Sequence, residues 1–499
     1  MAHQTLRLRA AHRRLQSHGS LPRNVWESWD SIVENSPWTE LFNRLRSSGD
    51  VLIESACSAA DSEALLLELG PANRNIVSKR IRSALRALTG SPELPSNIVL
   101  IGGPPCQAYS IVGRSRNRGI PGYRPEKDPR HFLYLEYLHV IAEFSPALFV
   151  MENVKGILTS KVKENPIFEE IIKDLRSPGA ALGRKNSAEY ELIPLAPSGN
   201  GGTFSSGGDF LVQAEEFGVP QARHRVIILG VRKDVLDAAG SVDRLRRQPP
   251  PSVQDVIADL PQIRAELSYR GMGMHWKDAF RLPLFEVAID ELRHGAQSHS
   301  DRLADMLLKL RRKLEKMADP GTGAERWSVG THRPGPSKLW WWFNDRPSRL
   351  LSNHQSRSHM PADLVRYLFT SAFGHVAGRS PRLADFPPSL LPEHKNVVKD
   401  RLDETIFKDR FRVQLADQPA MTVTSHIAKD GHAFIHPDPH QCRSLTVREA
   451  ARLQTFPDTY VFLGSRTSQY TQVGNAVPPL LATQIAEIVA EVLRRAKLA

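Results

Sequence analysis

The chain has 499 residues, of which 41% are hydrophobic, and this length exceeds what one compact core ordinarily holds. We therefore expect two domains in a protein of ordinary globular composition. The formal net charge of +12 and the pI near 9.7 suit a polyanionic partner such as nucleic acid, although charge alone does not select one.

Targeting signals and cysteines are sparse. No apolar run approaches membrane-spanning length, and Met1–Ser17 lacks the hydrophobic segment of a secretory signal. The three cysteines, Cys57, Cys106 and Cys442, form no Cys-x-x-Cys pair, which argues against a disulfide framework and a structural zinc site. We expect a cytoplasmic protein that binds no metal and contacts no membrane.

The first 96 residues are predicted to be helical. Basic and mixed amphipathic patterns fill residues 1–49, and further helical patterns follow at 59–69 and 75–88. We interpret these segments as packing helices that carry no chemistry.

A short apolar run at 97–101 is too brief for a helix and predicts a buried strand. Two glycines and two prolines at 102–105 then lead into Cys106. The glycines permit a ligand to approach the backbone, and the prolines stiffen the turn. A lone cysteine after a strand is more often a small buried hydrophobe, but these neighbours favour a nucleophile.

The segment after Cys106 is a loop rich in glycine, proline and arginine. Such a loop is either a solvated surface or, beside a nucleophile, a grip for phosphates that closes over a substrate. We favour closure because the loop adjoins the strand end. Its basic residues are Arg114, Arg116, Arg118, Arg124, Lys127 and Arg130.

A helical pattern at 131–144 precedes a second apolar run at 147–151, which ends in Glu152-Asn153-Val154. Strand, helix and strand in this order predict a right-handed βαβ unit with parallel strands, whose ligands bind at the carboxyl ends of the strands. Cys106 and Glu152 are therefore expected at one edge of the sheet.

Two short apolar runs at 210–212 and 226–229 predict an antiparallel hairpin. The connection between them contains Gln221, Arg223 and Arg225. Because the second strand returns from the carboxyl edge, both arginines are expected near Cys106 and Glu152.

The interval 232–440 lacks the alternation of strands and helices. Three prolines at 249–251 mark a boundary, and 302–317 predicts a basic amphipathic helix. The aromatic run Trp340–Phe343 is about as easily core as DNA contact. Beyond it, Thr446 and Glu449 predict a capping box that opens a helix, and a last helix follows 474–479 and extends to Leu493.

Five motifs in this order resemble those of the DNA cytosine-5 methyltransferases: Gly-Gly-Pro-Pro-Cys-Gln at 102–107, Glu-Asn-Val at 152–154, Gln-x-Arg-x-Arg at 221–225, the helix at 446–454, and Gly-Asn-Ala-Val-Pro-Pro at 474–479. The resemblance implies an α/β class I methyltransferase fold, a Rossmann-like doubly wound sheet with a smaller target-recognition domain. It divides the chain into a catalytic domain at 1–235, a linker and target-recognition domain at 236–440, and motifs at 441–499 that return to the catalytic domain.

The resemblance also implies roles. Cys106 would attack C6 of a cytosine flipped out of duplex DNA, and Glu152 would hold the N3 atom and the exocyclic amine of that base. Arg225 would bind the cytosine O2, with Arg223 supporting the site.

Ligands and partners follow from the same resemblance. We expect S-adenosyl-L-methionine as cofactor, double-stranded DNA as substrate, and a monomer that acts in restriction-modification, where a cognate restriction endonuclease can be its partner. The cofactor is expected to contact Pro104, Leu133, Asn475 and Ala476. DNA is expected to contact Gln107, Ser110, Arg114, Arg116 and Arg118.

One departure from the family is expected to matter. Its members open with a strand, a Phe-x-Gly-x-Gly loop for the cofactor, and a second strand ending in an acidic residue, and none of these is visible before Asn97. We therefore expect the first strands of the sheet to be missing. Three alternatives stay open: a noncatalytic or cofactor-deficient DNA-binding relative, an RNA cytosine-5 methyltransferase, and a cysteine hydrolase with His131 or His224 as base, which no oxyanion-hole signature supports.

Overall fold

The computed structural model describes residues 2–19, 21–104, 134–162, 165–185, 187–197, 206–268, 273–295, 299–328, 338–344, 350–392 and 410–498. They form two compact units. The helical unit comprises Met1–Leu65, Val219–Ala222 and Pro250–Pro479, and the sheet unit comprises Leu66–Gly218, Arg223–Pro249 and Leu480–Ala499. The division from sequence placed 1–65 with the catalytic residues, whereas in the structure this segment packs within the helical unit.

The sheet unit is built on a mixed sheet with the strand order β1-β2-β8-β5, in which β6 also pairs with β8. β1 and β2 run parallel, with Val99 opposite Leu148, and β8 runs antiparallel to β2, β5 and β6. The predicted βαβ unit and the predicted hairpin are both confirmed. The strands are β1 (Val99–Gly102), β2 (Leu148–Val154), β5 (Tyr190–Pro194), β6 (Leu211–Gln213) and β8 (His224–Arg232).

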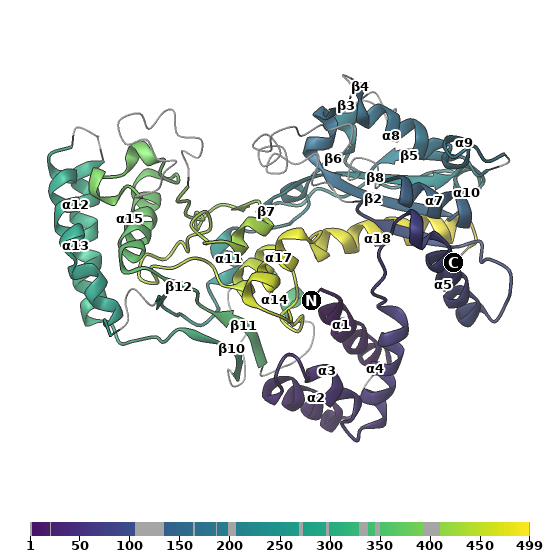
Figure 1. Cartoon of the computed structure of the whole chain (residues 1–499). Helices are drawn as coiled ribbons and strands as arrows, with labels where there is room; N and C mark the ends of the chain where they lie inside the picture. The colour runs from purple at the N-terminus through teal and green to yellow at the C-terminus, as the bar shows by residue number, and fades with distance from the viewer. Residues whose placement is uncertain are drawn as a thin grey trace. The chain divides into compact units, whose positions relative to one another are not determined.

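Helices cover the sheet. Tyr137 and Ile141 of α7 and Ile171 of α8 share a buried cluster with Phe149 and Ile228, so both helices lie on one face. α18 runs along the strands, as Figure 1 shows. The helices of this unit are α5 (Arg74–Thr89), α7 (Tyr134–Phe144), α8 (Ile167–Arg176), α9 (Pro178–Ala181), α10 (Lys233–Ala239) and α18 (Pro479–Arg495), and its short elements are η1 (Pro71–Asn73), β3 (Lys161–Val162), β4 (Asn165–Pro166), η4 (Lys155–Thr159), η5 (Gly207–Phe210) and η6 (Ala214–Glu216).

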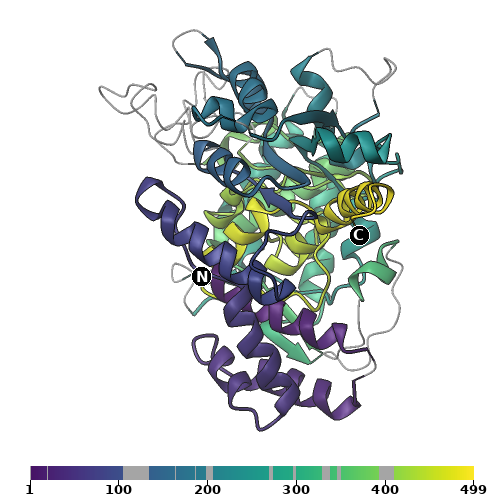
Figure 2. The same ribbon diagram turned by 90° about the vertical axis from the view of Figure 1, so that its right-hand side faces the viewer.

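Four helices at the start of the chain form a bundle within the helical unit, visible in Figures 1 and 2. Its core contains Leu15, Trp29 and Ile53 together with Leu463 from far along the chain. The helix predicted at 59–69 begins earlier, because the Asp50 carboxylate accepts hydrogen bonds from the first amides of α4. The four helices are α1 (Ala2–Ser17), α2 (Arg23–Asn35), α3 (Leu41–Arg46) and α4 (Val51–Glu63).

The remainder of the helical unit packs around α12, α13 and α15, whose apolar faces share one core. Three strand pairs border it: β10 with β11 antiparallel, and β9 with β12 and β7 with β13 parallel. Its elements are β7 (Gln221–Ala222), α11 (Val253–Ile257), β9 (Glu266–Leu267), η8 (Trp276–Arg281), α12 (Pro283–Arg293), α13 (Ser300–Lys316), β10 (Gly323–Ser328), α14 (Trp340–Phe343), β11 (Leu350–Gln355), β12 (Ser358–His359), α15 (Pro361–Ala377), η9 (Leu383–Asp385), η10 (Pro388–Leu390), β13 (Ala420–Met421), η12 (Ser425–Ala428), α16 (Val447–Leu453) and α17 (Arg466–Asn475).

The aromatic run at 340–343 divides between the two roles left open by the sequence. Phe343 is fully buried, and the Trp342 indole N–H donates to the Thr455 carbonyl at 2.6 Å, so both stabilise the unit. Trp341 is 67% exposed, and its ring lies edge-on to that of Trp342.

Arg466–Arg495 is long and apolar enough to cross a membrane by composition alone. In the structure it is two helices, α17 and α18, which end and begin on either side of Ala476–Pro478. Apolar residues of both helices, including Tyr470, Val473 and Leu481, are buried in the protein.

The predicted capping box at Thr446 is confirmed, and it belongs to a buried polar network. The Thr446 hydroxyl accepts from the Glu449 amide, and the Glu449 carboxylate accepts from the Thr446 amide. Arg443 reaches that carboxylate at 2.6 Å, and His354 Nδ1 lies 3.1 Å from the Thr446 hydroxyl oxygen. Burial raises the pKa of Glu449, but the ion pair with Arg443 outweighs it and holds this pKa well below its usual range.

This network predicts acid sensitivity. Burial lowers the pKa of His354 and of His436 from 6.5 to about 4. The unfolded chain binds these protons below pH 6.5 while the folded chain does not, so folding stability is fully present above pH 6.5 and is lost as the pH falls toward 4. Each histidine contributes roughly 3 kcal/mol to this loss. Urea denaturation between pH 7.5 and 5 checks it: His354→Gln should flatten the dependence, and the exposed-site control His294→Gln should not.

Candidate active site

The carboxyl ends of β1 and β2 lie side by side. The Asn153 side-chain amide donates to the Pro104 carbonyl at 3.4 Å. A Cβ atom at Gly103 would lie 3.2 Å from Glu152 Oε2, so the glycine admits the carboxylate close to the backbone. The beginning of the motif at 102–107 is therefore brought to Glu152 and Asn153, as the βαβ topology predicts.

Arg225 joins the same edge through an ion pair. Its Nε lies 2.9 Å from Glu152 Oε1, and both side chains are largely withdrawn from solvent. The register explains the contact, because β8 runs antiparallel to β2 with Arg225 opposite Val154, two residues beyond Glu152. Arg225 also donates to the His224 carbonyl at 2.8 Å. The Glu152 carboxylate and the Arg225 guanidinium thus lie together at the strand ends. The carboxylate can accept hydrogen bonds from a polar ring, and the guanidinium can donate to the same ring.

The other residues of the motif at 221–225 make further contacts within the protein. Arg223 is fully buried, and its carbonyl accepts from the Ala214 amide at 3.0 Å. Gln221 lies in the helical unit, where its side chain accepts from the Val423 amide at 2.6 Å and donates to the Leu453 carbonyl at 3.1 Å. Gln221 therefore has a structural role. His224 is held by Glu215 at 2.7 Å.

Tyr137 and Asn153 were not predicted as site residues. The Tyr137 hydroxyl donates to the Val150 carbonyl at 3.0 Å, and its ring lies where a Cβ atom at Gly102 would approach within 2.6 Å. The Tyr137 ring thus packs against Gly102 at the end of β1. No local pattern singles it out on its helix, whereas Asn153 stands within the Glu-Asn-Val motif and could have been named from it.

Most predicted residues of the loop lie outside the described residues. These are Cys106, Gln107, Ser110, Arg114, Arg116, Arg118 and Leu133, and the alternative base His131 also belongs to this group.

Asn475 and Ala476 lie at the end of α17, in the helical unit. Asn475 is exposed, and the Ala476 amide caps the helix by donating to the Val473 carbonyl. The preceding Gly474 packs directly on backbone: a Cβ atom there would lie 2.3 Å from the Ser425 amide nitrogen and from the Thr424 carbonyl carbon. The glycine of this motif is required by a close approach of two backbone segments.

We expect Gly474→Ala to destabilise the helical unit by about 1–3 kcal/mol, because neither backbone segment can yield as a flexible side chain would. Chemical denaturation measures the loss. Gly70→Ala is the matched control, since a Cβ atom at Gly70 meets nothing within 4 Å. Equal stability of the two variants would contradict the close packing.

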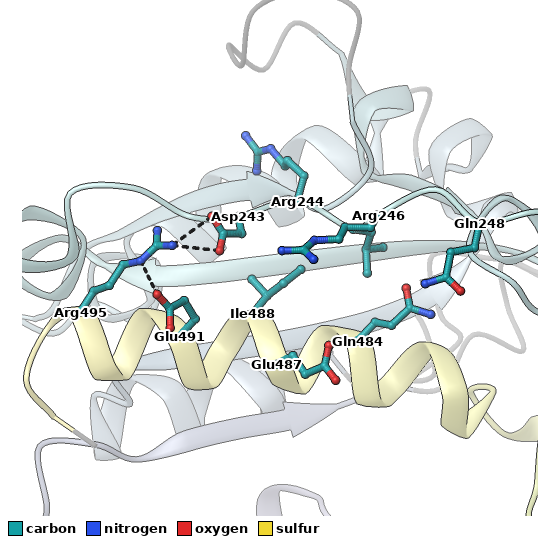
Figure 3. A pocket seen from close by; sticks show the side chains of 10 residues that line it. Asp243, Arg244, Arg246, Gln248, Gln484, Glu487, Ile488, Glu491 and Arg495 are labelled. Atoms are coloured by element: carbon teal, nitrogen blue, oxygen red, sulfur yellow. Dashed lines mark hydrogen bonds and ion pairs between the residues drawn. The ribbon is translucent and has the colours of Figure 1, made fainter. Parts of the chain in front are cut away.

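A cavity of about 470 Å³ lies in the sheet unit between residues 243–248 and α18, and Figure 3 shows its lining. Arg495 spans it to Asp243 at 3.0 Å and to Glu491 at 2.7 Å. None of the predicted site residues lines this cavity, and its charges are of both signs, so we assign it no ligand.

A family model described as C-5 cytosine-specific DNA methylase matches residues 73–186, 208–333 and 344–491, most of the chain. The chain belongs to this family, whose activity is that of a DNA (cytosine-5-)-methyltransferase. Its members take the transferred methyl group from S-adenosylmethionine and act on DNA.

Relatives agree with this family. The chain is 35% identical over 398 residues to the type II methyltransferase M.Bpa9945I of Bacillus paralicheniformis. The aligned region covers 79% of this chain and 70% of that protein. It is 29% identical over 432 residues to the DNA (cytosine-5-)-methyltransferase M.ApeKI of Aeropyrum pernix, with 79% and 81% covered. A crystal structure of a prophage-encoded E. coli protein assigned as a DNA modification methyltransferase aligns at a TM-score of 0.44 and 16% identity, covering 83% of each chain. That score is too low to carry an argument.

Of the residues expected at the cofactor, Pro104, Asn475 and Ala476 lie within the described part of the chain, and Leu133 lies outside it. Before β1, residues 2–19 and 21–98 contain helices and connections but no strand. Pro104 is at the sheet edge, while Asn475 and Ala476 belong to the other unit.

Proposed function

We propose that this protein activates C5 of a flipped-out cytosine in duplex DNA through a covalent adduct with Cys106. The observation that carries the proposal is the Glu152–Arg225 pair at 2.9 Å, beside the strand end that leads into Cys106. The proposed fold is the part of a class I methyltransferase sheet that holds the base.

The chemistry begins with addition. The Cys106 thiolate forms a bond to C6 of cytosine, and the electron pair of the C5–C6 double bond moves toward C5. Glu152 holds N3 and the exocyclic amine and stabilises the protonated N3 that addition favours, while Arg225 donates to O2. S-adenosylmethionine, when bound, supplies the methyl group to C5. Loss of the C5 proton and elimination of the thiolate then restore the aromatic ring.

The cytosine must leave the helix to meet these residues, because C6 is stacked within a duplex. The basic residues 114–118 are proposed to contact the phosphates around it. Since relatives such as M.Bpa9945I are type II methyltransferases, we also propose that the protein protects sites cut by a cognate restriction endonuclease.

Activation of C5 can be tested without the cofactor. In the adduct, C5 can take a proton from water. When C5 then loses the hydrogen that it originally carried, that hydrogen passes to the solvent. DNA tritiated at cytosine C5 should therefore release tritium with the purified chain, and Glu152→Gln should slow release by at least roughly a hundredfold. Arg232→Gln is the control, because Arg232 lies on β8 at the end opposite to Arg225 and far along the strand from Glu152.

A second candidate function has one observation in its favour. The absence of a strand before β1 in residues 2–19 and 21–98 fits a DNA-binding relative without catalysis. DNA binding without any tritium release would establish that alternative and overturn the proposal.

A further inference from the structure

Another cavity, of about 440 Å³, lies within the helical unit, where α11, α13, the end of α15 and the segment 436–441 meet. Its volume falls within the roughly 300–1,000 Å³ of sites that bind small molecules. The exposed side chains of Gln254, Gln262 and His375 belong to its lining, so the cavity opens to solvent. The described lining contains none of the residues expected at the cytosine, the cofactor or the DNA.

Much of the wall of this cavity is apolar. Met306 of α13 is half-buried, and the other large apolar residues of the wall are buried. An apolar body placed among them would leave water at little cost, as in most small-molecule sites. The apolar wall residues are Ile257, Leu260, Met306, Leu310, Pro437 and Pro439.

The charged groups of the wall are all acidic. The described lining contains two carboxylates, Asp438 and Glu449, and neither lysine nor arginine. Arg443 already compensates Glu449, at a distance of 2.6 Å. Asp438 pairs instead with a histidine, His440, whose Nδ1 lies 2.8 Å from Asp438 Oδ1, and it pairs with no lysine or arginine of the described chain.

The two histidines beside Asp438 are uncharged. The Nε2 atom of His440 is buried and has no hydrogen-bond partner in the described chain. A protonated ring would bury a charged N–H there without an acceptor, which is costly, so the ring proton lies on Nδ1 and faces Asp438. His436 Nδ1 accepts from the Asp438 amide at 3.1 Å, and burial lowers the pKa of His436 to about 4.

Asp438 therefore contributes one uncompensated negative charge to an apolar cavity. Burial raises the pKa of this carboxyl group, but hydrogen bonds from His440 outweigh burial and hold the pKa below its usual range. The carboxylate accepts from the His440 ring at 2.8 Å, from the His440 amide at 3.0 Å and from the Gln441 side chain at 3.3 Å. Since a carboxylate accepts about four hydrogen bonds, and this side chain is 27% exposed, a ligand can still donate to it.

The lining also indicates which kind of cation fits. A quaternary ammonium group is typically held by a cage of aromatic rings, and the described lining contains no phenylalanine, tyrosine or tryptophan. A primary ammonium group instead donates N–H bonds to a carboxylate, and such charge-assisted bonds are among the stronger ones.

We propose that this cavity binds a small organic cation, in which a primary ammonium group donates to Asp438 and an apolar body packs against Ile257, Met306 and Leu310. The inference rests on the wall of the helical unit and not on the chemistry at Cys106. Binding is measured without DNA, so ligand binding and tritium release can fail independently.

The probe is hexylammonium, compared with hexanoate, 1-hexanol and hexyltrimethylammonium at pH 7.5. Calorimetry on the full chain should show saturable binding of hexylammonium that is at least about tenfold tighter than that of hexanoate or 1-hexanol. Hexyltrimethylammonium has the same charge without an N–H donor and should bind at least about fivefold more weakly. Hydrogen exchange in the segment 436–441 should slow when hexylammonium is bound.

Two variants separate charge from shape. Asp438→Asn removes the charge and keeps an acceptor for His440, so it should weaken hexylammonium at least about tenfold and leave 1-hexanol unchanged. If circular dichroism shows that this variant does not fold, Met306→Lys decides the matter, because its ammonium group at the half-buried wall should repel the probe by a similar factor. Asp305→Asn is the matched control, since Asp305 is exposed and lies outside the lining.

Three results would overturn the inference. One is that hexylammonium shows no saturable binding, and another is that hexanoate, 1-hexanol or the quaternary ammonium binds as tightly. The third is that hexylammonium keeps its affinity in the folded Asp438→Asn and Met306→Lys variants, or loses it equally in Asp305→Asn.

Discussion

Cys106→Ser is expected to lower tritium release from cytosine C5 by roughly a thousandfold or more, because a hydroxyl is a far weaker nucleophile than a thiolate at neutral pH. DNA affinity should stay within about twofold, since serine is nearly isosteric and the phosphate contacts are untouched. Gel-shift titration and tritium release on the same preparation measure both quantities.

The controls lie in the same chain. Cys57 and Cys442 are buried free thiols, and burial raises the pKa of Cys57 to about 12, so it is not a nucleophile at neutral pH. Cys57→Ala should therefore leave activity per folded molecule unchanged. Appreciable tritium release by Cys106→Ser, or its loss in Cys57→Ala with the fold intact, would refute the assignment of the nucleophile.

The second large effect concerns the cofactor. We expect the 499-residue chain alone to show no saturable S-adenosylmethionine binding up to about millimolar concentration, because an open α/β sheet binds a nucleotide with a glycine loop after one strand and an acidic residue after another.

Calorimetric titration of the purified chain with S-adenosylmethionine measures cofactor binding. Tight binding by the chain alone would show that residues 1–96 contain a cofactor site of another kind. Because tritium release needs no cofactor, this prediction can fail while the assignment of Cys106 stands.

Local signals predicted the sheet edge well. Two short apolar runs separated by one helix predict a parallel βαβ unit. This topology alone placed Glu152 near the turn after β1. The hairpin then placed Arg225 beside Glu152. The capping box at Thr446 was equally predictable, because its hydrogen bonds join residues three apart.

Contacts between distant segments could not be predicted in this way. Nothing in the pattern around Gly474 indicates that its neighbour is the backbone at 424–425, and nothing at Tyr137 indicates that it supports Gly102. The first helices were correctly interpreted as packing helices, but their amphipathic pattern does not indicate which other residues pack against them. In the structure, Leu463 and Val461 pack against these helices.

This bundle has a consequence for synthesis on the ribosome. Its core contains Leu463 as well as Leu15 and Ile53, so α1–α4 emerge about 400 residues before the core can close. At typical rates of roughly 5–20 residues per second, the nascent bundle waits about 20–80 seconds with the site of Leu463 uncovered. The chain therefore presents chaperones with a prolonged target at its amino end, and slower translation lengthens this interval.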